Sequence, residues 1–370
     1  MGVLRLILAI AVVITHTEAI FGFRLVGGDV AVQAFYIISG FYMAMILTEK
    51  YTGKKSYKLF ITNRFMRLFP IYWIVLLGTI LASIVKLKIS GNGTLNMYFQ
   101  YSDFMNFGSF LFLIFTNIFM FFQDIVMFLG LDTTTGNLFL TTNFQETSPM
   151  LHQFLFIPQA WTIGVELMFY SIVPLLAKKK TKYIIALIFF SLSIRLVLVF
   201  GFNLKYDPWT YRFFPTELVF FLAGIIAYRL YKYLQRFQIK EIYLKIIWLG
   251  ILLFTVSSSF LPSKTIYSFS VKNWFYLFIF VMSLPFIFSL TKKWKFDRYI
   301  GELSYPVYIS HMLILSVCTN LKVSTLLGGL GVTTTIASIL CAIVLNELVQ
   351  KRIEKIRQKR VENSTIAANN

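Results

Sequence analysis

The chain of 370 residues has little charge and almost no cysteine for its length. Only 14% of its residues are charged, whereas 57% are hydrophobic and 40 are phenylalanine. A soluble domain of this size could not bury so much apolar surface, so the composition predicts a polytopic membrane protein. The two cysteines, Cys318 and Cys341, exclude a disulfide framework and have no neighbouring ligands at zinc-site spacing. We therefore expect no metal.

Basic residues are absent from residues 90–160 and concentrated elsewhere. Of the 35 Lys and Arg residues, 25 fall in five blocks, at 50–67, 178–182, 229–245, 292–298 and 351–360. The positive-inside rule places these blocks in the cytoplasm and residues 90–160 outside. The formal net charge of +19 then reflects membrane topology, and we do not expect nucleic acid as a partner.

Ten apolar stretches approach the length of about 20 residues that a bilayer-crossing helix needs. They cover roughly 3–20, 30–48, 67–87, 159–177, 183–201, 214–231, 243–261, 273–290, 300–320 and 325–348. We predict an all-α, polytopic bundle of about ten transmembrane helices, with both termini in the cytoplasm. Residues 1–350 form one membrane domain without internal repeats, and 351–370 form a basic cytoplasmic tail whose end we expect to be disordered.

One further apolar stretch, 109–130, does not fit as a span. An odd number of crossings between the flanking basic blocks would place one block on the wrong side of the membrane. The stretch is also interrupted by Asn117, Gln123 and Asp124. We predict that it is a re-entrant or interfacial segment packed against protein.

Several ionisable residues lie inside the predicted spans. Arg5 begins the first span, and His16 lies 11 residues further, roughly 16 Å along a helix. The topology places the following residues at a similar outer level: His16, Glu166, Arg195, Arg212, Glu217 and His311. An unpaired charge at that depth costs several kcal/mol, so we predict one polar cavity that opens outward. His152, in the external segment, is interpreted as a solvated loop residue.

Each of these residues also has a purely structural interpretation. His16 could hydrogen-bond a backbone carbonyl. Glu166 could be the counter-ion of Arg195 or Arg212. Arg212 could instead pair with Glu217 at the membrane interface. These alternatives stay open at the level of the sequence.

A basic pair, Arg64 and Arg67, occupies the cytoplasmic entrance of the third predicted span. Residues three apart lie on one face of a helix, and two guanidinium groups there suit a phosphate or diphosphate. The alternative is that both side chains extend to the membrane interface and only fix the topology.

Five short motifs follow one another along the chain. Arg5 and His16 bracket ten residues, and the later motifs are GGDVAVQAFYIISGFYM (27–43), RFMR (64–67), WTIGVELMFY (161–170) and GELSYPVYISH (301–311). In this order they resemble the acyltransferase-3 family of integral membrane proteins, which O-acylate extracytoplasmic carbohydrates in bacteria. Asp29 departs from the small or aromatic residues usual at its position, which puts the substrate in doubt more than the chemistry.

The resemblance implies an O-acyltransferase that takes an acetyl or other acyl group from cytoplasmic acyl-CoA, such as acetyl-CoA. The nucleotide phosphates would lie at Arg5, Arg64 and Arg67. His16 would be the general base, because an imidazole suits a sugar hydroxyl at neutral pH, and Glu166 would orient it or contact the acceptor. Substrate-binding or supporting roles are implied for Asp29, Ser39, Trp161, Arg195, Arg212, Tyr308 and His311.

The implied setting is the bacterial inner (plasma) membrane, with a multi-pass chain in the lipid bilayer. The acceptor would be a capsular, O-antigen or exopolysaccharide sugar, and a homo-oligomer is compatible with the sequence. Two rival classes stay open. A secondary transporter of an anion or sugar would also place polar residues near the midplane, although the chain has no paired Gly- or Pro-interrupted helices in matching halves. A polysaccharide polymerase or flippase component would have large external segments such as 90–160.

The topology can be tested with reporter fusions. A reporter that is active only outside the cytoplasm should be active when fused near Thr134, because residues 90–160 lack the Lys and Arg that retain a loop inside. The same reporter fused near Lys180 should be silent. Activity of a cytoplasm-only reporter at Thr134 would overturn the predicted topology.

Overall fold

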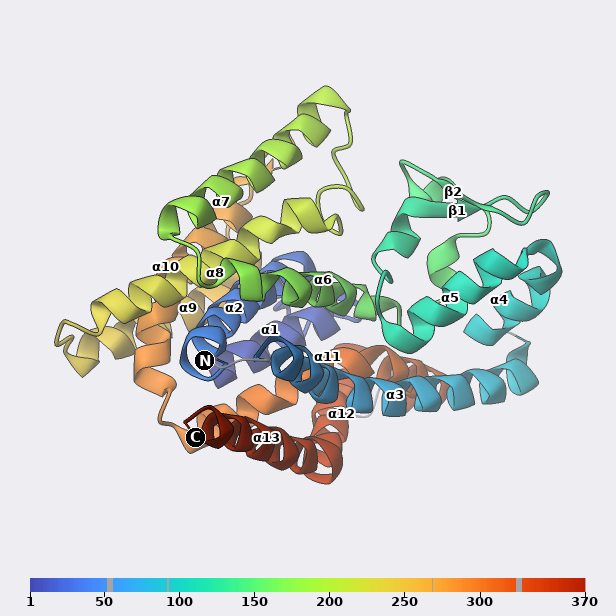
Figure 1. Ribbon diagram of the computed structural model, residues 1–370. Helices are drawn as coiled ribbons and strands as arrows, with labels where there is room; N and C mark the ends of the chain where they lie inside the picture. Colours follow the sequence, from blue (N-terminus) through green and yellow to red (C-terminus); the bar gives the residue numbers. More distant parts are fainter. Residues whose placement is uncertain (52–55, 92, 268, 324–327, 370) are drawn as a thin grey trace.

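Helices make up most of the chain in the computed structural model, which describes residues 1–51, 56–91, 93–267, 269–323 and 328–369 (Figure 1). The prediction of an all-helical fold is confirmed. The α-helices are α1 (Gly2–Thr15), α2 (Gly28–Glu49), α3 (Ser56–Ser90), α4 (Thr94–Tyr101), α5 (Phe107–Phe119), α6 (Trp161–Leu176), α7 (Thr181–Leu196), α8 (Phe214–Leu234), α9 (Glu241–Ser257), α10 (Val271–Thr291), α11 (Lys295–Asn320), α12 (Leu330–Leu345) and α13 (Lys351–Asn369).

Short elements connect these helices. Single turns of 3₁₀ helix are η1 (Ser102–Phe104), η2 (Ile125–Phe128), η3 (Phe144–Glu146), η4 (Leu151–Phe154), η5 (Pro158–Ala160) and η7 (Ser258–Phe260), and π turns are η6 (Val197–Gly201) and η9 (Asn346–Gln350). The antiparallel strand pairs are β1 (Leu129–Leu131) with β2 (Leu138–Leu140), and β3 (Thr265–Ile266) with β4 (Phe269–Ser270).

Eight helical segments among the described residues are long and apolar enough to cross a membrane. They are Gly28–Glu49, Ser56–Ile89, Pro158–Leu176, Thr181–Gly201, Phe214–Leu234, Glu241–Phe260, Val271–Thr291 and Leu330–Asn363. Each overlaps one of the ten spans predicted from the sequence. The start of the last predicted span, at residues 325–327, lies outside the described residues.

The two remaining predicted spans, 3–20 and 300–320, form helices that differ from this group. Helix α1 has only 14 residues, about 21 Å at 1.5 Å per residue, which is shorter than a bilayer core of about 30 Å. Helix α11 is long, with 26 residues, but its first turns carry charged side chains. That these two helices complete ten crossings stays a prediction.

The apolar stretch 109–130 does not form one long helix. Its first part belongs to α5, which has 13 residues, and its second part belongs to the turn η2 and the strand β1. Figure 1 shows α4, α5 and the β1–β2 hairpin at the far end of α3, away from the main helix bundle. A re-entrant or interfacial position for this stretch stays a prediction.

Asn117 in α5 fixes the stretch against the protein. Its side-chain amide donates to the Phe154 carbonyl at 3.0 Å, and its side-chain oxygen accepts from the Phe156 amide at 2.8 Å. Tyr72 of α3 donates its hydroxyl to the Asn117 backbone carbonyl. Both side chains are buried, so α5 and the segment leading to α6 are held together by polar contacts.

The tail of the chain continues the last predicted span. Helix α13 follows α12 through the π turn η9 and packs against α3. The expected disorder concerns residues 362–370, of which Asn370 and the side chains from 364 onward lie outside the described residues. That part of the prediction is untested.

Helix α1 is fixed against α11 at its first turn. The Asp297 carboxylate accepts from the Gly2 amide at 2.7 Å and from the Val3 amide at 2.9 Å, which satisfies free N–H groups at the start of α1. A Cβ atom on Gly2 would lie 1.5 Å from the Asp297 carbonyl oxygen. Glycine therefore lets the two helices touch, and this contact sets Arg5 and His16 of α1 relative to α11.

Helices α2 and α8 cross at two glycines. A Cβ atom on Gly40 would lie 1.9 Å from the Phe221 carbonyl oxygen, and one on Gly224 would lie 2.0 Å from the Ile37 carbonyl oxygen. Small residues at a crossing bring helix backbones together in membranes. Ser39, the neighbour of Gly40, is thereby held at a fixed position in the bundle.

Substitution of Gly224 by Ala should destabilise the protein, because no space exists for the methyl group. Overpacking of this kind costs about 1–3 kcal/mol. Gly250→Ala is the matched control, since nothing lies within 4 Å of a Cβ atom there. Thermal unfolding of the purified variants in detergent should show a lower midpoint for Gly224→Ala and an unchanged or higher one for Gly250→Ala, because alanine favours helix. Equal midpoints for the two variants would contradict the close crossing.

Candidate active site

Two cavities of different character lie inside the helix bundle. The first, here the basic cavity, has a volume of about 450 Å³ and is lined by Arg5, Arg64 and Arg67 among other residues. The second, here the histidine cavity, has a volume of about 560 Å³ and is lined by His16 and His152 among other residues. The sequence predicted a single polar cavity. That prediction is wrong: of the six residues expected to share it, His16 and Arg212 line the histidine cavity, Glu166 lines the basic cavity, and Arg195, Glu217 and His311 line neither.

The basic cavity has an excess of positive charge. Among the described residues, its lining carries six Lys or Arg side chains, Arg5, Lys50, Arg64, Arg67, Lys292 and Arg298, and four carboxylates, Glu166, Asp297, Glu302 and Glu354. The Asp297 carboxylate already accepts hydrogen bonds from the first amides of α1. Such a surface favours a ligand with more than one negative charge.

Helices α1 and α3 bring the three predicted arginines to this cavity. Arg64 is 5% exposed and its guanidinium group lies 5.8 Å from the centre of the Phe60 ring. Its Nε has no hydrogen-bond partner in the described part of the chain. Arg67 follows one turn later on the same helix. A buried guanidinium with a free donor is suited to an anionic ligand that supplies the missing acceptor.

Glu166 of α6 also lines the basic cavity. Its Oε1 accepts from Ser39 Oγ at 2.5 Å and from the Tyr170 hydroxyl. Of the two predicted roles for Glu166, orientation of His16 is not supported by these contacts, and contact with an acceptor stays a prediction. Glu166 is not the counter-ion of Arg195 or Arg212, which pair with Glu217 and Asp207. The predicted depth of a residue along α6 does not tell which way its side chain points around the helix. Trp161 lines the histidine cavity, whereas Glu166, five residues later, lines the basic cavity.

His16 ends α1 at the histidine cavity, where its side chain is exposed. His311 of α11 is completely buried beside it, and the two ring centres are 5.1 Å apart. His16 Nδ1 lies 3.0 Å from the Val12 carbonyl oxygen, and His311 Nδ1 lies 2.6 Å from the Tyr308 carbonyl oxygen.

These two contacts determine which nitrogen of each ring is basic. A carbonyl oxygen only accepts hydrogen bonds, so Nδ1 of each neutral imidazole carries the proton. Nε2 is then a free acceptor in both rings. For His311, Nε2 has no hydrogen-bond partner in the described residues. The carbonyl contact expected as a structural alternative for His16 thus exists, and it leaves the ring in the tautomer of a general base.

Arg212 forms the polar wall of the histidine cavity. Its Nε and Nη2 donate to the two carboxylate oxygens of Asp207 at 2.6 and 2.8 Å. The guanidinium carbon lies 4.2 Å from the centre of the Trp161 ring. Asp29 lines the same cavity. The predicted pairing of Arg212 with Glu217 is wrong, because Asp207 is its partner.

Arg195 and Glu217 form a separate buried pair. Arg195 Nη2 donates to Glu217 at 2.6 Å and to the Thr216 carbonyl at 3.0 Å, while Nη1 donates to the Thr210 carbonyl at 2.7 Å. Neither residue lines either cavity. This arrangement supports a structural role, in which the pair ties α7 to α8.

His152 is the residue that the sequence interpretation missed. It was interpreted as a solvated loop residue, but it is half-buried, lines the histidine cavity and meets the edge of the Phe144 ring at 5.4 Å. Burial, together with the positive charge of Arg212, lowers the pKa of His152, so the ring is neutral at neutral pH. The rarity of histidine was the available signal that this residue has a role, since the chain has only three histidines.

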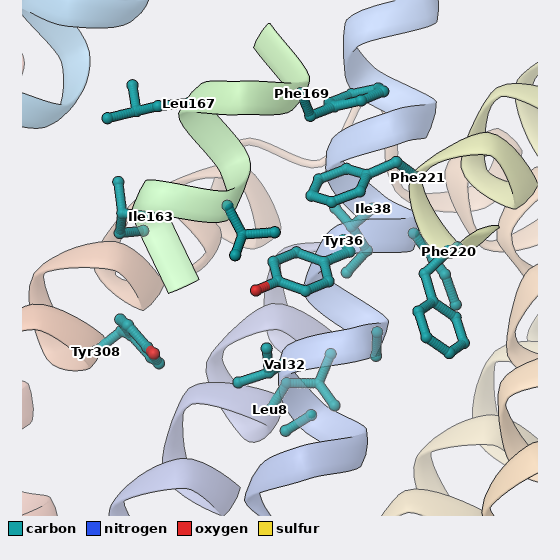
Figure 2. Close-up of a cluster of buried hydrophobic side chains, with 14 of the residues drawn as sticks. Leu8, Val32, Tyr36, Ile38, Ile163, Leu167, Phe169, Phe220, Phe221 and Tyr308 are labelled. Carbon is teal, nitrogen blue, oxygen red and sulfur yellow. The ribbon is translucent and has the colours of Figure 1, made fainter. Parts of the chain in front are cut away.

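Two side chains border both cavities and are here called the partition: Val32 of α2 and Tyr308 of α11. The Tyr308 hydroxyl lies 2.7 Å from Thr162 Oγ1 and donates to the Gln159 carbonyl at 2.9 Å. Figure 2 shows Tyr308 extending from α11 toward Val32 and Tyr36, within the apolar cluster between α2 and α6. The basic cavity and the histidine cavity are therefore neighbours that meet at these two side chains.

Residues 1–347 match the acyltransferase domain family of the acyltransferase-3 type. The chain belongs to the acyltransferase-3 family. An uncharacterized protein of Aquifex aeolicus (strain VF5) is 25% identical over 211 residues, which cover 54% of this chain and 89% of that protein. No solved structure matches the chain.

Family membership and the helical segments together identify a membrane acyltransferase. The match includes every residue of the histidine cavity and all of the basic cavity except Glu354 and Gln358 on α13. Within the described ranges, no three His, Cys, Asp or Glu side chains converge as a metal site would require. The chemistry to be explained is the transfer of an acyl group.

Proposed function

We propose that this membrane acyltransferase moves an acetyl or similar acyl group from cytoplasmic acyl-CoA to a hydroxyl of an extracytoplasmic carbohydrate. The observation that carries the proposal is that two cavities of different chemistry share Val32 and Tyr308 in their walls. One suits a polyanionic donor and the other a neutral, hydroxyl-bearing acceptor. The corresponding cellular setting is a bacterial plasma membrane.

The donor side is supported by charge. Coenzyme A carries several phosphate charges at one end and its thioester at the other, joined by an extended arm. Arg5, Arg64 and Arg67 converge in the basic cavity, and guanidinium groups bind phosphates through paired hydrogen bonds. With the phosphates there, the arm extends along Ser39 and Glu166 toward the partition. Glu166 is then a donor-site residue and does not assist His16.

The acceptor side is supported by the mixture of groups in the histidine cavity. Asp29 offers carboxylate oxygens, Gln159 and His152 offer further polar atoms, and Trp161 supplies an aromatic wall. Hydroxyl groups can bind to such a surface through directional hydrogen bonds. The net charge of its lining is negative, from Asp29 and Asp207 against Arg212, which disfavours an anionic acceptor.

The transfer itself needs a base at the partition. His16 Nε2 accepts the proton of the acceptor hydroxyl while the oxygen forms a bond to the thioester carbon. The carbon–sulfur bond then breaks, and the thiolate of coenzyme A leaves and takes up a proton. His311, whose Nε2 is free and whose ring adjoins His16, is the neighbouring base.

Replacement of His16 tests the proposed base. His16→Gln should lower acetyl transfer by about 10² to 10⁴, because glutamine does not accept the proton at neutral pH. Binding of acetyl-CoA should be unchanged. The measurement is transfer of labelled acetyl from acetyl-CoA to soluble methyl glycosides by the detergent-purified protein. If His16→Gln kept most of the activity, His311 would become the leading candidate for the base.

Replacement of Arg64 and Arg67 tests the donor site. Arg64→Ala and Arg67→Ala should each raise the Kd for acetyl-CoA about tenfold or more, because each removes a charge-assisted hydrogen bond. Lysine should restore binding poorly, since the paired donors are lost. Lys58→Ala, at an exposed position of the same helix, is the control. Unchanged binding in the double Ala variant would leave topology as the only role of this pair.

A further inference from the structure

Helix α13 contributes to the basic cavity although it lies beyond the acyltransferase domain match. The match ends at residue 347, whereas Glu354 and Gln358 line the cavity. Figure 1 shows α13, in dark red, running across the end of the bundle near α3 and α11. A part of the proposed donor site is therefore formed by this chain's own C-terminal extension of the domain.

The position of α13 is fixed by a specific contact with α3. Arg360 donates to Asn63 Oδ1 at 2.9 Å and to Thr62 Oγ1 at 2.8 Å. Asn63 is itself completely buried and donates to the Tyr51 hydroxyl at 3.0 Å. Thr62 and Asn63 directly precede Arg64 in α3, so α13 is held beside the phosphate-binding residues proposed above.

Arg357 lies on the same face of α13, one turn before Arg360. It is only 5% exposed and does not itself line the basic cavity, but its Nη1 donates to Oε2 of Glu354, which does. Its Nε has no hydrogen-bond partner within the described residues. Arg64 and Arg67 are close enough to repel it electrostatically.

This arrangement is electrostatically incomplete. Three guanidinium groups, from Arg64, Arg67 and Arg357, are gathered near only two carboxylates, those of Glu354 and Glu302. Like charges held together in a partly desolvated place destabilise one another unless an anion joins them. The Nε atoms of both Arg64 and Arg357 lack acceptors in the described chain, so an anion with several acceptor oxygens would satisfy them.

We infer that Arg357 is a further binding residue for the phosphate end of the acyl-CoA donor, and that Glu354 is its resting counter-ion, displaced when the phosphate binds. The inference rests on the proposed function. The thioester must reach the partition at Val32 and Tyr308, so the nucleotide phosphates stay at the opposite end of the cavity, where α13 lies. A phosphate there replaces the Glu354 carboxylate as the acceptor of the Arg357 guanidinium.

The test compares two substitutions on α13 that change charge equally. Arg357→Met should raise the Kd for acetyl-CoA about tenfold to a hundredfold. Lys359→Met removes the same charge at an exposed position of the same helix and should change Kd by less than about twofold. Both are measured by equilibrium binding to the full-length purified protein at one fixed salt concentration.

Glu354→Gln should change the Kd for acetyl-CoA in the opposite direction to Arg357→Met. Because Glu354 competes with the phosphate for Arg357, its removal should lower the Kd for acetyl-CoA about two- to fivefold. In the Arg357→Met background the same substitution should have a smaller effect. If the Arg357–Glu354 pair only held α13 in place, both single variants would weaken binding alike and lower the unfolding midpoint, and the inference would be overturned. The Glu354→Gln measurement tests the inference even if Arg357→Met fails to fold.

Competition identifies the source of the phosphate. Adenosine 3′,5′-bisphosphate should displace acetyl-CoA from the wild type, and more weakly from Arg357→Met. Displacement by phosphatidylglycerol micelles alone would assign the site to a lipid headgroup and overturn the inference. Wild-type protein that neither binds nor uses acetyl-CoA would refute the proposed function itself. Normal binding and transfer, with equal Kd values for Arg357→Met and Lys359→Met, would refute only the role of Arg357.

Discussion

A charged side chain inside an apolar helix bundle needs a partner, because hydrocarbon offers neither counter-ions nor hydrogen bonds. The bundle meets this requirement in two ways. Arg195 of α7 and Glu217 of α8 form a buried pair that lines neither cavity, whereas Arg212 and Asp207 form a pair in the wall of the histidine cavity. Arg5, Arg64 and Arg67 instead face a cavity in which carboxylates are outnumbered. The Arg195–Glu217 pair therefore holds the bundle together, whereas the unbalanced charge of the basic cavity is suited to bind a ligand.

The partition lies where two cavities with different chemical linings meet. The proposed polyanionic donor and hydroxyl-bearing acceptor need different surfaces, but their reacting atoms must meet. Val32 and Tyr308 border both cavities, and the Tyr308 hydroxyl is fixed by Thr162 and Gln159 of the segment that begins α6. His311 lies one turn after Tyr308 and bonds to its carbonyl oxygen. The partition and the imidazole pair are therefore built from the same turn of α11.

Much of the fold could be predicted from the sequence, because apolar length and basic blocks are strong signals in membrane helices. The arginines could be predicted as a group, since Arg5, Arg64 and Arg67 all lie at the basic ends of helices. The direction in which a side chain points around its helix could not be predicted. Trp161 and Glu166 are five residues apart, about 140° around α6, and they face different cavities. His152 was missed because its surroundings are set by irregular turns, which carry no periodic pattern. The beginning of α3 was placed too late, at 67 instead of Ser56, because its first turns are polar and resemble a loop.

The segment Leu330–Asn363 is one continuous helical path of 34 residues, interrupted only by the π turn at Asn346–Gln350. Its first part packs along α11, which carries Tyr308 and His311, and its last part covers the basic cavity through Glu354 and Gln358. Figure 1 shows that the path changes direction where α12 meets α13. A displacement of α13 at the basic cavity can reach α12, and through it α11, by way of this π turn. The stiffness of that one turn therefore sets how strongly α13 and α11 are mechanically coupled through the segment.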